Sequence, residues 1–87
     1  MKQLVSSGFL RKYKKLTKKN PHLAQILDEK FALFDRNPKH QSLRLHKLSG
    51  KKTEQRSITI KGNLRVIFQY INEGILVVDI GSHDEVY

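Results

Sequence analysis

Cysteine and tryptophan are absent from this 87-residue chain, and proline and methionine are rare. Without cysteine, the chain can form neither a disulfide framework nor a thiolate zinc site. It also lacks any apolar run near the roughly 18 residues that a membrane span requires. A signal peptide is not expected, because Leu4 and Val5 are followed at once by Ser6, Ser7 and Gly8. We therefore expect one cytoplasmic domain, residues 1–87, with no membrane association.

Acidic side chains are scarce and unevenly placed. The chain has 17 Lys and Arg against 8 Asp and Glu, a formal net charge of +9. Residues 1–27 carry seven basic residues and no acid, residues 36–65 carry nine and one acid, and residues 66–87 carry four acids and no Lys or Arg. A lysine-rich helix face can simply be solvated, but an excess in two separate segments favours a nucleic acid or another polyanion as partner.

The first half of the chain has helical periodicity after a short strand at residues 2–5. Ser6 or Ser7 can cap a first helix, whose apolar stripe lies among basic residues and consists of Phe9, Leu10, Tyr13 and Leu16. Asn20-Pro21 predicts the start of a second helix and Asn37-Pro38 its end. The second stripe contains Leu23, Ile26, Leu27, Phe31 and Phe34. The tight turn between the helices predicts an antiparallel hairpin.

Beyond Pro38 the apolar period changes towards two, which is typical of strands. We expect strands over residues 43–46, 56–60, 64–70 and 75–80, with hairpin turns at 61–63 and 72–74. The predicted fold class is α+β in the order β-α-α-β-β-β, with the two-helix hairpin packed on one face of an antiparallel sheet. The other face, or its rim, is then left for function.

Two of the four histidines are candidates for chemistry. His46 ends an alternating strand and His83 follows the last strand, whereas His22 is expected at the surface and His40 in a loop. A pair of imidazoles can act as general base and general acid in phosphodiester cleavage, because each titrates near neutral pH. Two hydrogen-bonded surface histidines are the alternative. No spacing of His, Asp and Glu indicates a metal site, and no cofactor is expected.

Arg65 interrupts an apolar strand. Alternation places it on the face of Ile67, opposite Val66 and Phe68. A guanidinium there can bind a phosphate through two hydrogen bonds, or it can be an exposed strand residue or pair with an acid such as Asp79 or Glu85. The other basic candidates for this site are Lys47, Lys51, Lys52 and Arg56. The terminal Tyr87 can stack on a base or complete the core.

Three ordered motifs carry a family resemblance: LHKLSG at residues 45–50, GNLRVIF at 62–68 and IGSHDEVY at 80–87. With them, nearly the whole chain resembles the RelE/ParE superfamily of bacterial toxins from type II toxin–antitoxin modules, and most of all the RelE and YafQ mRNA interferases. The resemblance implies a RelE-like microbial RNase fold. It also implies a metal-independent endoribonuclease that cuts mRNA in the ribosomal A site and so inhibits translation. In that reaction the ribose 2′-hydroxyl attacks the adjacent phosphate.

The resemblance also suggests roles for individual residues. His46 and His83 match YafQ histidines, Arg65 matches a RelE arginine, and Tyr87 matches the terminal aromatic residue of both. Lys51 and Lys52 fall near the catalytic lysines of RelE. Two positions depart from the pattern: Thr59 stands where YafQ has a histidine, and Asn63 where it has an aspartate.

On this hypothesis His83 and His46 transfer protons, and Tyr87 stacks on or orients the target nucleotide. Phosphate charge is stabilised by Arg65 together with Lys47, Lys51, Lys52 and Arg56. The basic first helix binds ribosomal RNA phosphates through residues that include Arg11, Lys12 and Lys15. The expected partners are the ribosome with its mRNA, and a cognate antitoxin with an acidic segment that wraps the toxin.

Two other classes of function stay open at this point. A ParE-like toxin would poison DNA gyrase without cutting nucleic acid, and the fold and charge fit it equally well. A non-catalytic relative would bind ribosomes or nucleic acid only. The histidine pair with Tyr87 favours the nuclease, because a protein-binding inhibitor has no need of that set.

Overall fold

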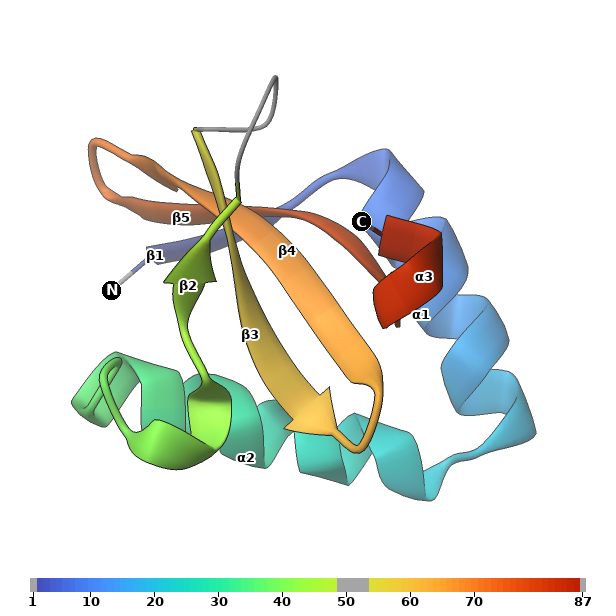
Figure 1. Cartoon of the computed structure of the whole chain (residues 1–87). Coiled ribbons are helices and arrows are strands. Elements are labelled where there is room, and N and C mark those ends of the chain that lie inside the picture. The colour runs from blue at the N-terminus through green and yellow to red at the C-terminus, as the bar shows by residue number, and fades with distance from the viewer. Residues whose placement is uncertain (1, 49–53, 87) are drawn as a thin grey trace.

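A five-stranded sheet in the order β1-β5-β4-β3-β2 organises the molecule (Figure 1). The computed structural model describes residues 2–48 and 54–86. The elements are β1 (Lys2–Val5), α1 (Ser7–Lys19), α2 (His22–Arg36), a 3₁₀ turn η1 (Gln41–Leu43), β2 (His46–Lys47), β3 (Gln55–Lys61), β4 (Leu64–Ile71), β5 (Gly74–Ser82) and α3 (His83–Val86). The predicted α+β class and element order are confirmed. Within this part of the chain, no helix is long and apolar enough to cross a membrane.

Strands β2 to β5 form the expected antiparallel meander, and β1 adds to it in parallel alongside β5. The sheet is therefore mixed. Two rows of directly paired residues run across the strands. One row consists of His46, Ser57, Ile67 and Asp79, and the other, two residues away along β3 and β4, consists of Thr59, Arg65 and Gly81. Residues opposite each other on neighbouring strands project to the same sheet face.

Helix α1 begins where its sequence predicts. The Ser6 hydroxyl accepts a hydrogen bond from the Phe9 backbone N–H (3.0 Å) and donates one to the Val78 carbonyl (3.0 Å). The same side chain thus caps the helix and ties its start to β5. The turn at residues 20–21 is as tight as predicted, and Figure 1 shows α1 and α2 diverging from it, with α1 beside β5 and α2 below β3.

The main core lies between these helices and one face of the sheet. Phe9 of α1 and Leu27 and Phe34 of α2 pack there with Val66 and Phe68 of β4. A smaller apolar cluster occupies part of the other face and contains Leu48, Ile67, Val78 and Val86. The helices therefore cover one face, as expected, while the second face carries the short helix α3.

Helix α3 has no counterpart in the sequence prediction. Its start is a reciprocal capping box: Ser82 N–H donates to the Glu85 carboxylate (2.8 Å), and Glu85 N–H donates to the Ser82 hydroxyl (3.3 Å). Val86, only 2% exposed, anchors the helix in the small cluster.

The strand predicted at residues 43–46 begins only at His46. His40 explains the difference, because its Nδ1 accepts a hydrogen bond from Ser42 N–H (3.2 Å) and lies 2.8 Å from the Ser42 hydroxyl. Such local side-chain bonds compete with an extended backbone and favour a turn. The turn ends at Arg44 in the left-handed region, with φ of 47°.

Candidate functional site

The sheet face that carries α3 also carries polar side chains from three strands. Ile67 lies in the small cluster on this face, whereas Val66 and Phe68 lie in the main core. Arg65 has the same alternation as Ile67, so its predicted face is confirmed. We call this surface the polar face; by the register its strand residues include His46, Ser57, Thr59 and Arg65.

His46 is held beside its own backbone at the start of β2. Its Nδ1 lies 3.1 Å from the Arg44 carbonyl oxygen, and both ring nitrogens lie 3.4 Å from the hydroxyl of Ser57. Ser57 is fully buried, so this contact fixes the ring against the sheet. When Nδ1 carries the proton and donates it to the carbonyl, Nε2 is the basic nitrogen.

His83 stands at the opposite side of the polar face. Its backbone N–H donates to the Asn63 carbonyl (3.0 Å), which binds the first residue of α3 to the β3–β4 turn. The imidazole side chain is half exposed, and its Nδ1 lies 3.7 Å from the carboxylate of Asp84. Gly81, two residues earlier, is the register partner of Arg65. His83 therefore lies just beyond the arginine.

The capping box that starts α3 has an electrostatic signature. Three interactions hold the pKa of the Glu85 carboxyl below its usual range. The largest is the hydrogen bond from the Ser82 backbone N–H, followed by the one with the Ser82 hydroxyl and then by the positive charge of Lys12. Space for this helix depends on Gly81, because a Cβ there would lie 3.1 Å from Val86 and 3.3 Å from the Glu85 side chain.

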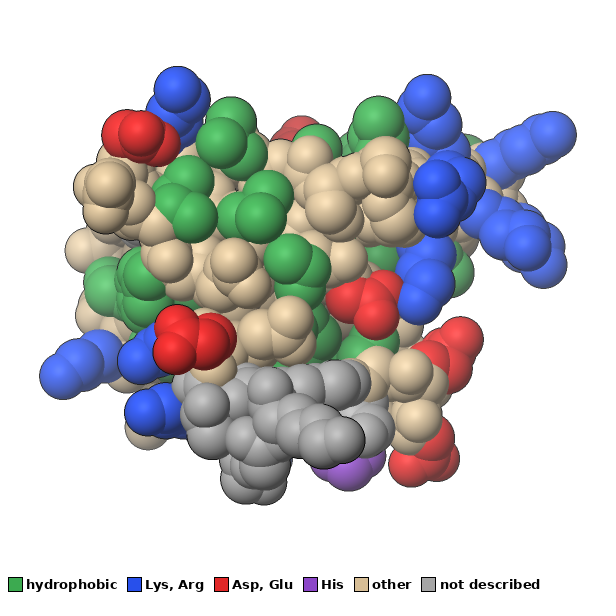
Figure 2. Space-filling model, turned by 90° about the horizontal axis from the view of Figure 1, so that it is seen from above, with side chains coloured by type: hydrophobic (Ala, Val, Ile, Leu, Met, Phe, Trp, Pro, Cys, Tyr) green, Lys and Arg blue, Asp and Glu red, His purple; other side chains and the backbone are tan. Residues whose placement is uncertain are grey.

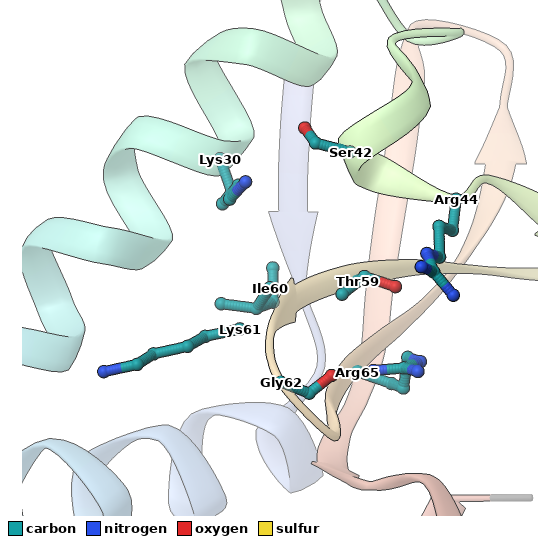
Figure 3. A pocket seen from close by; sticks show the side chains of 8 residues that line it. All are labelled: Lys30, Ser42, Arg44, Thr59, Ile60, Lys61, Gly62 and Arg65. Atoms are coloured by element: carbon teal, nitrogen blue, oxygen red, sulfur yellow. Dashed lines mark hydrogen bonds between the residues drawn. The ribbon is translucent and has the colours of Figure 1, made fainter.

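Arg65 borders a pocket of about 420 Å³. Its Nη1 donates to the carbonyls of Gly62 (2.8 Å) and Leu64 (3.4 Å), and within residues 2–48 and 54–86 it pairs with no acid. Asp79, one of the acids considered as a partner, binds Lys12 instead at 2.7 Å. The pocket is lined by Lys30, Ser42, Arg44, Thr59, Ile60, Lys61, Gly62 and Arg65 (Figure 3).

Two other basic candidates lie away from this group. Lys47, Arg56 and Phe68 share one row, which places Lys47 and Arg56 on the face opposite Arg65. The Arg56 guanidinium lies over the ring of Tyr70, 4.9 Å from its centroid, as in a cation–π contact. Their role in phosphate binding stays a prediction, and this geometry does not join them to Arg65.

The basic residues predicted on the first helix do cluster. Arg11, Lys12, Lys14 and Lys15 line one hollow on α1, and Figure 2 shows Lys and Arg side chains gathered at that end of the molecule. Lys12 is also engaged with Asp79. Lys51, Lys52 and Tyr87 lie outside the described residues, and their roles stay predictions.

Sequence reasoning missed Arg44, Lys30 and Ser57 as members or neighbours of the polar face. Arg44 lies in an alternating segment that favours a strand, so the neighbouring sequence did not predict the left-handed conformation of this residue. Ser57 lay on a recognised strand, but its burial beside His46 depends on the pairing of β2 with β3. Among the described residues, no group of three His, Asp or Glu side chains could hold a metal ion.

The fold is that of small bacterial toxins. A copper-bound mutant toxin from Helicobacter pylori aligns with 100% of this chain and 99% of its own length, at 20% identity and a TM-score of 0.87. The YoeB/ParE toxin from Agrobacterium tumefaciens aligns with 95% and 99%, at 15% identity and 0.80. A chain of the E. coli DinJ-YafQ toxin-antitoxin complex aligns with 99% and 96%, at 17% identity and 0.79. At these identities the likeness establishes a shared fold.

The sequence itself identifies the family. Residues 1–87 match the family described as a bacterial toxin of type II toxin-antitoxin systems, YafQ. The chain therefore belongs to the YafQ family of type II toxins, as its three motifs predict. No curated protein sequence shows significant similarity to it.

Proposed function

We propose that this toxin is an endoribonuclease that cuts mRNA on the ribosome. The observation that carries the proposal is the arrangement of the polar face. Arg65 lies on β4, His46 two strands away on β2, and His83 on the other side, just after β5. A cation therefore stands between two groups able to transfer protons, on a toxin with a formal net charge of +9.

This arrangement suits an in-line displacement at phosphorus. One imidazole removes the proton of the ribose 2′-hydroxyl, the 2′-oxygen attacks the adjacent phosphate, and the other imidazole protonates the departing 5′-oxygen. The products are a 2′,3′-cyclic phosphate and a 5′-hydroxyl. Attacking and leaving oxygens lie on opposite sides of phosphorus, and the two histidines lie on opposite sides of Arg65. Three strand spacings of ~4.8 Å separate β2 from β5, and four residues of ~3.4 Å separate His83 from Asp79, the β5 residue in the row of His46. The backbones of the two histidines are therefore ~20 Å apart, and on this proposal both imidazoles reach inward to a shared phosphate.

The chain's own contacts suggest which imidazole is the base. The Arg44 carbonyl beside Nδ1 of His46 favours the tautomer with the proton on Nδ1 and the lone pair on Nε2. We assign His46 as base and His83 as acid. Arg65 stabilises the charge that develops on the phosphate, and its Nη1 bonds to two carbonyls hold it in place for that task. Tyr87 is proposed to stack on the target nucleotide.

The test is primer extension on a translated message, with purified wild type, His83→Ala and His46→Ala. Loss of one proton-transfer group should reduce cleavage by about 10²- to 10⁴-fold. His22→Ala is the matched control, because His22 is an exposed histidine at the start of α2. Equal cleavage by wild type and His83→Ala removes His83 from the mechanism. Inhibition of gyrase supercoiling with no mRNA cuts would replace the nuclease by the ParE-like function.

We also propose a cognate antitoxin as partner, with an acidic segment that wraps the toxin. The E. coli relative is found in a complex named DinJ-YafQ. In this chain, the basic hollow on α1 and the cations around Arg65 would attract such a segment. Co-purification with the product of the neighbouring reading frame tests this partner, and loss of the complex at high salt tests the electrostatic contribution.

A further inference from the structure

The pocket beside Arg65 gathers four cations from separate parts of the chain. Lys30 comes from α2, Arg44 from the turn after η1, Lys61 from the end of β3 and Arg65 from β4. The other lining residues are Ser42, Thr59, Ile60 and Gly62, so none of the eight is acidic. Like charges that line one pocket with no acid among the lining residues repel one another, and such a pocket attracts an anion.

Thr59 marks where the anion would lie. Its hydroxyl oxygen is buried and has no hydrogen-bond partner among the described residues. A buried polar group without a partner costs free energy, so a ligand that supplies the missing bond is favoured there. Figure 3 shows this oxygen pointing to the side of the pocket where the guanidinium groups of Arg44 and Arg65 lie.

Both arginines are held in position by the backbone. Arg44 has φ of 47°, a conformation that costs a non-glycine residue free energy. The turn before it is fixed by the His40–Ser42 hydrogen bonds, and Arg44 N–H donates to the Gln41 carbonyl (3.2 Å). Arg65 uses one nitrogen, Nη1, for its two carbonyl bonds. Since a guanidinium has five N–H donors, others remain for a ligand.

We propose that Arg44, Thr59 and Arg65 form one phosphate-binding pocket, which seats a backbone phosphate of the RNA on the polar face. Lys30 and Lys61 add attraction at its rim. The inference rests on the proposed function in taking RNA as the source of the phosphate. It assigns Arg44 and Thr59 to substrate binding, and it gives the threonine at the position of a YafQ histidine a different task, hydrogen bonding in place of proton transfer.

A phosphate suits this pocket better than a carboxylate. Its oxygens point in tetrahedral directions and can accept from two guanidinium groups on different elements and from a hydroxyl at the same time. A carboxylate offers two oxygens in one plane, which matches a single arginine. The antitoxin's acidic segment is therefore the competing occupant that the experiment must distinguish.

The test is a ¹⁵N NMR titration of the full chain at low salt. The probes are inorganic phosphate and a 2′-O-methyl RNA trinucleotide, which cannot be cleaved because it lacks the attacking hydroxyl. Thr59→Val removes the hydroxyl at nearly constant shape. Arg44→Asn removes the charge with a residue that tolerates the left-handed region. Arg36→Asn is the control, because it removes an exposed arginine that does not line the pocket.

With wild type, both probes should shift the backbone amides of Ser42, Arg44, Thr59 and Arg65. Arg44→Asn should weaken binding of either probe by about tenfold or more, and Thr59→Val by several-fold, with Arg36→Asn unchanged. If Arg44→Asn does not give a dispersed spectrum, Lys61→Gln replaces it, since that exposed side chain can change without strain.

Equal binding by wild type, Thr59→Val and Arg44→Asn would overturn the inference, as would shifts confined to the α1 lysines. An acidic peptide that shifts the pocket where phosphate does not would assign it to a protein partner instead. Binding is measured separately from cleavage. If the toxin binds phosphate here but cuts no mRNA, the phosphate pocket stands and the proposed nuclease function is refuted.

Discussion

Val86 is the buried side chain that joins α3 to the small apolar cluster. A four-residue helix has no stability of its own, because forming the first helical turn is unfavourable. The 2% exposed Val86 side chain packs in the small cluster with Leu48 and Ile67. Val86→Ala removes two methyl groups, at ~0.8 kcal/mol each, and leaves a small cavity, so the cost is about 2 kcal/mol. That free energy corresponds to a ~30-fold larger population of the detached helix.

Hydrogen exchange measured residue by residue tests this reasoning. In Val86→Ala, the amides of Ser82 and Glu85 should exchange about 30-fold faster, because their capping bonds open when α3 leaves the sheet. Amides in β3 and β4 should keep their rates, since the main core is untouched. Val5→Ala is the matched control, because Val5 is 47% exposed on the edge strand β1.

The opposite pattern would refute the argument. If Val86→Ala speeds exchange equally in α3 and in the central strands, the valine belongs to the global core and α3 is not a separate unit. If exchange does not change at all, the small cluster does not hold the helix.

Three further predictions concern stability. Gly74→Ala should lower the thermal unfolding midpoint measured by calorimetry, because the alanine Cβ would lie 1.9 Å from the Lys2 carbonyl oxygen and force β1 from the sheet. An unchanged midpoint would contradict the pairing of β1 with β5. The lowered pKa of Glu85 means that its stabilisation is present above its unfolded pKa and lost as pH falls through the folded one. Lowering the pH should therefore reduce the protection of the Ser82 amide in wild type, measured as its exchange rate relative to an unstructured amide at the same pH, and Glu85→Gln should abolish that dependence. Lys12→Met should destabilise the protein by only about 0.2–1 kcal/mol in chemical denaturation, since its 2.7 Å ion pair is partly exposed.

Much of the fold follows from local patterns in the sequence. The apolar stripes of α1 and α2 and the alternation around Arg65 are repeats of 3.6 and 2 residues, and each can be recognised without knowing what it packs against. Ser6 is a capping residue beside its own helix. These features depend on neighbours in sequence, so the helices, the meander and the face of Arg65 were predictable.

The missed features depend on contacts or on short segments. The parallel pairing of β1 with β5 joins residues about seventy positions apart, and no local period encodes it. Helix α3 is too short to show a period, although its Ser82-x-x-Glu85 capping box was present in the sequence. The turn at Arg44 depends on a histidine cap four residues earlier, which a strand-like alternation concealed.

The candidate site was predictable in part for the same reason. The resemblance to YafQ directed attention to His46 and His83, and the register places them on opposite sides of Arg65. It also marked Thr59 as a departure, and only the structure reveals that its hydroxyl lacks a partner among the described residues. A side chain that looks like a loss in the sequence thus becomes the centre of a proposed phosphate site.

The pairing of β1 with β5 has a consequence for how the toxin is made. Lys2 pairs with Gly74 and Val5 with Val77, so β1 finds its partner only after β5 has been synthesised. Closing so long a loop is slow and comes late in folding. Until that moment β1 has no neighbour, and Ser6 has no Val78 carbonyl to bind. The sheet is therefore completed, and the start of α1 tied to it through Ser6, only after β5 has formed.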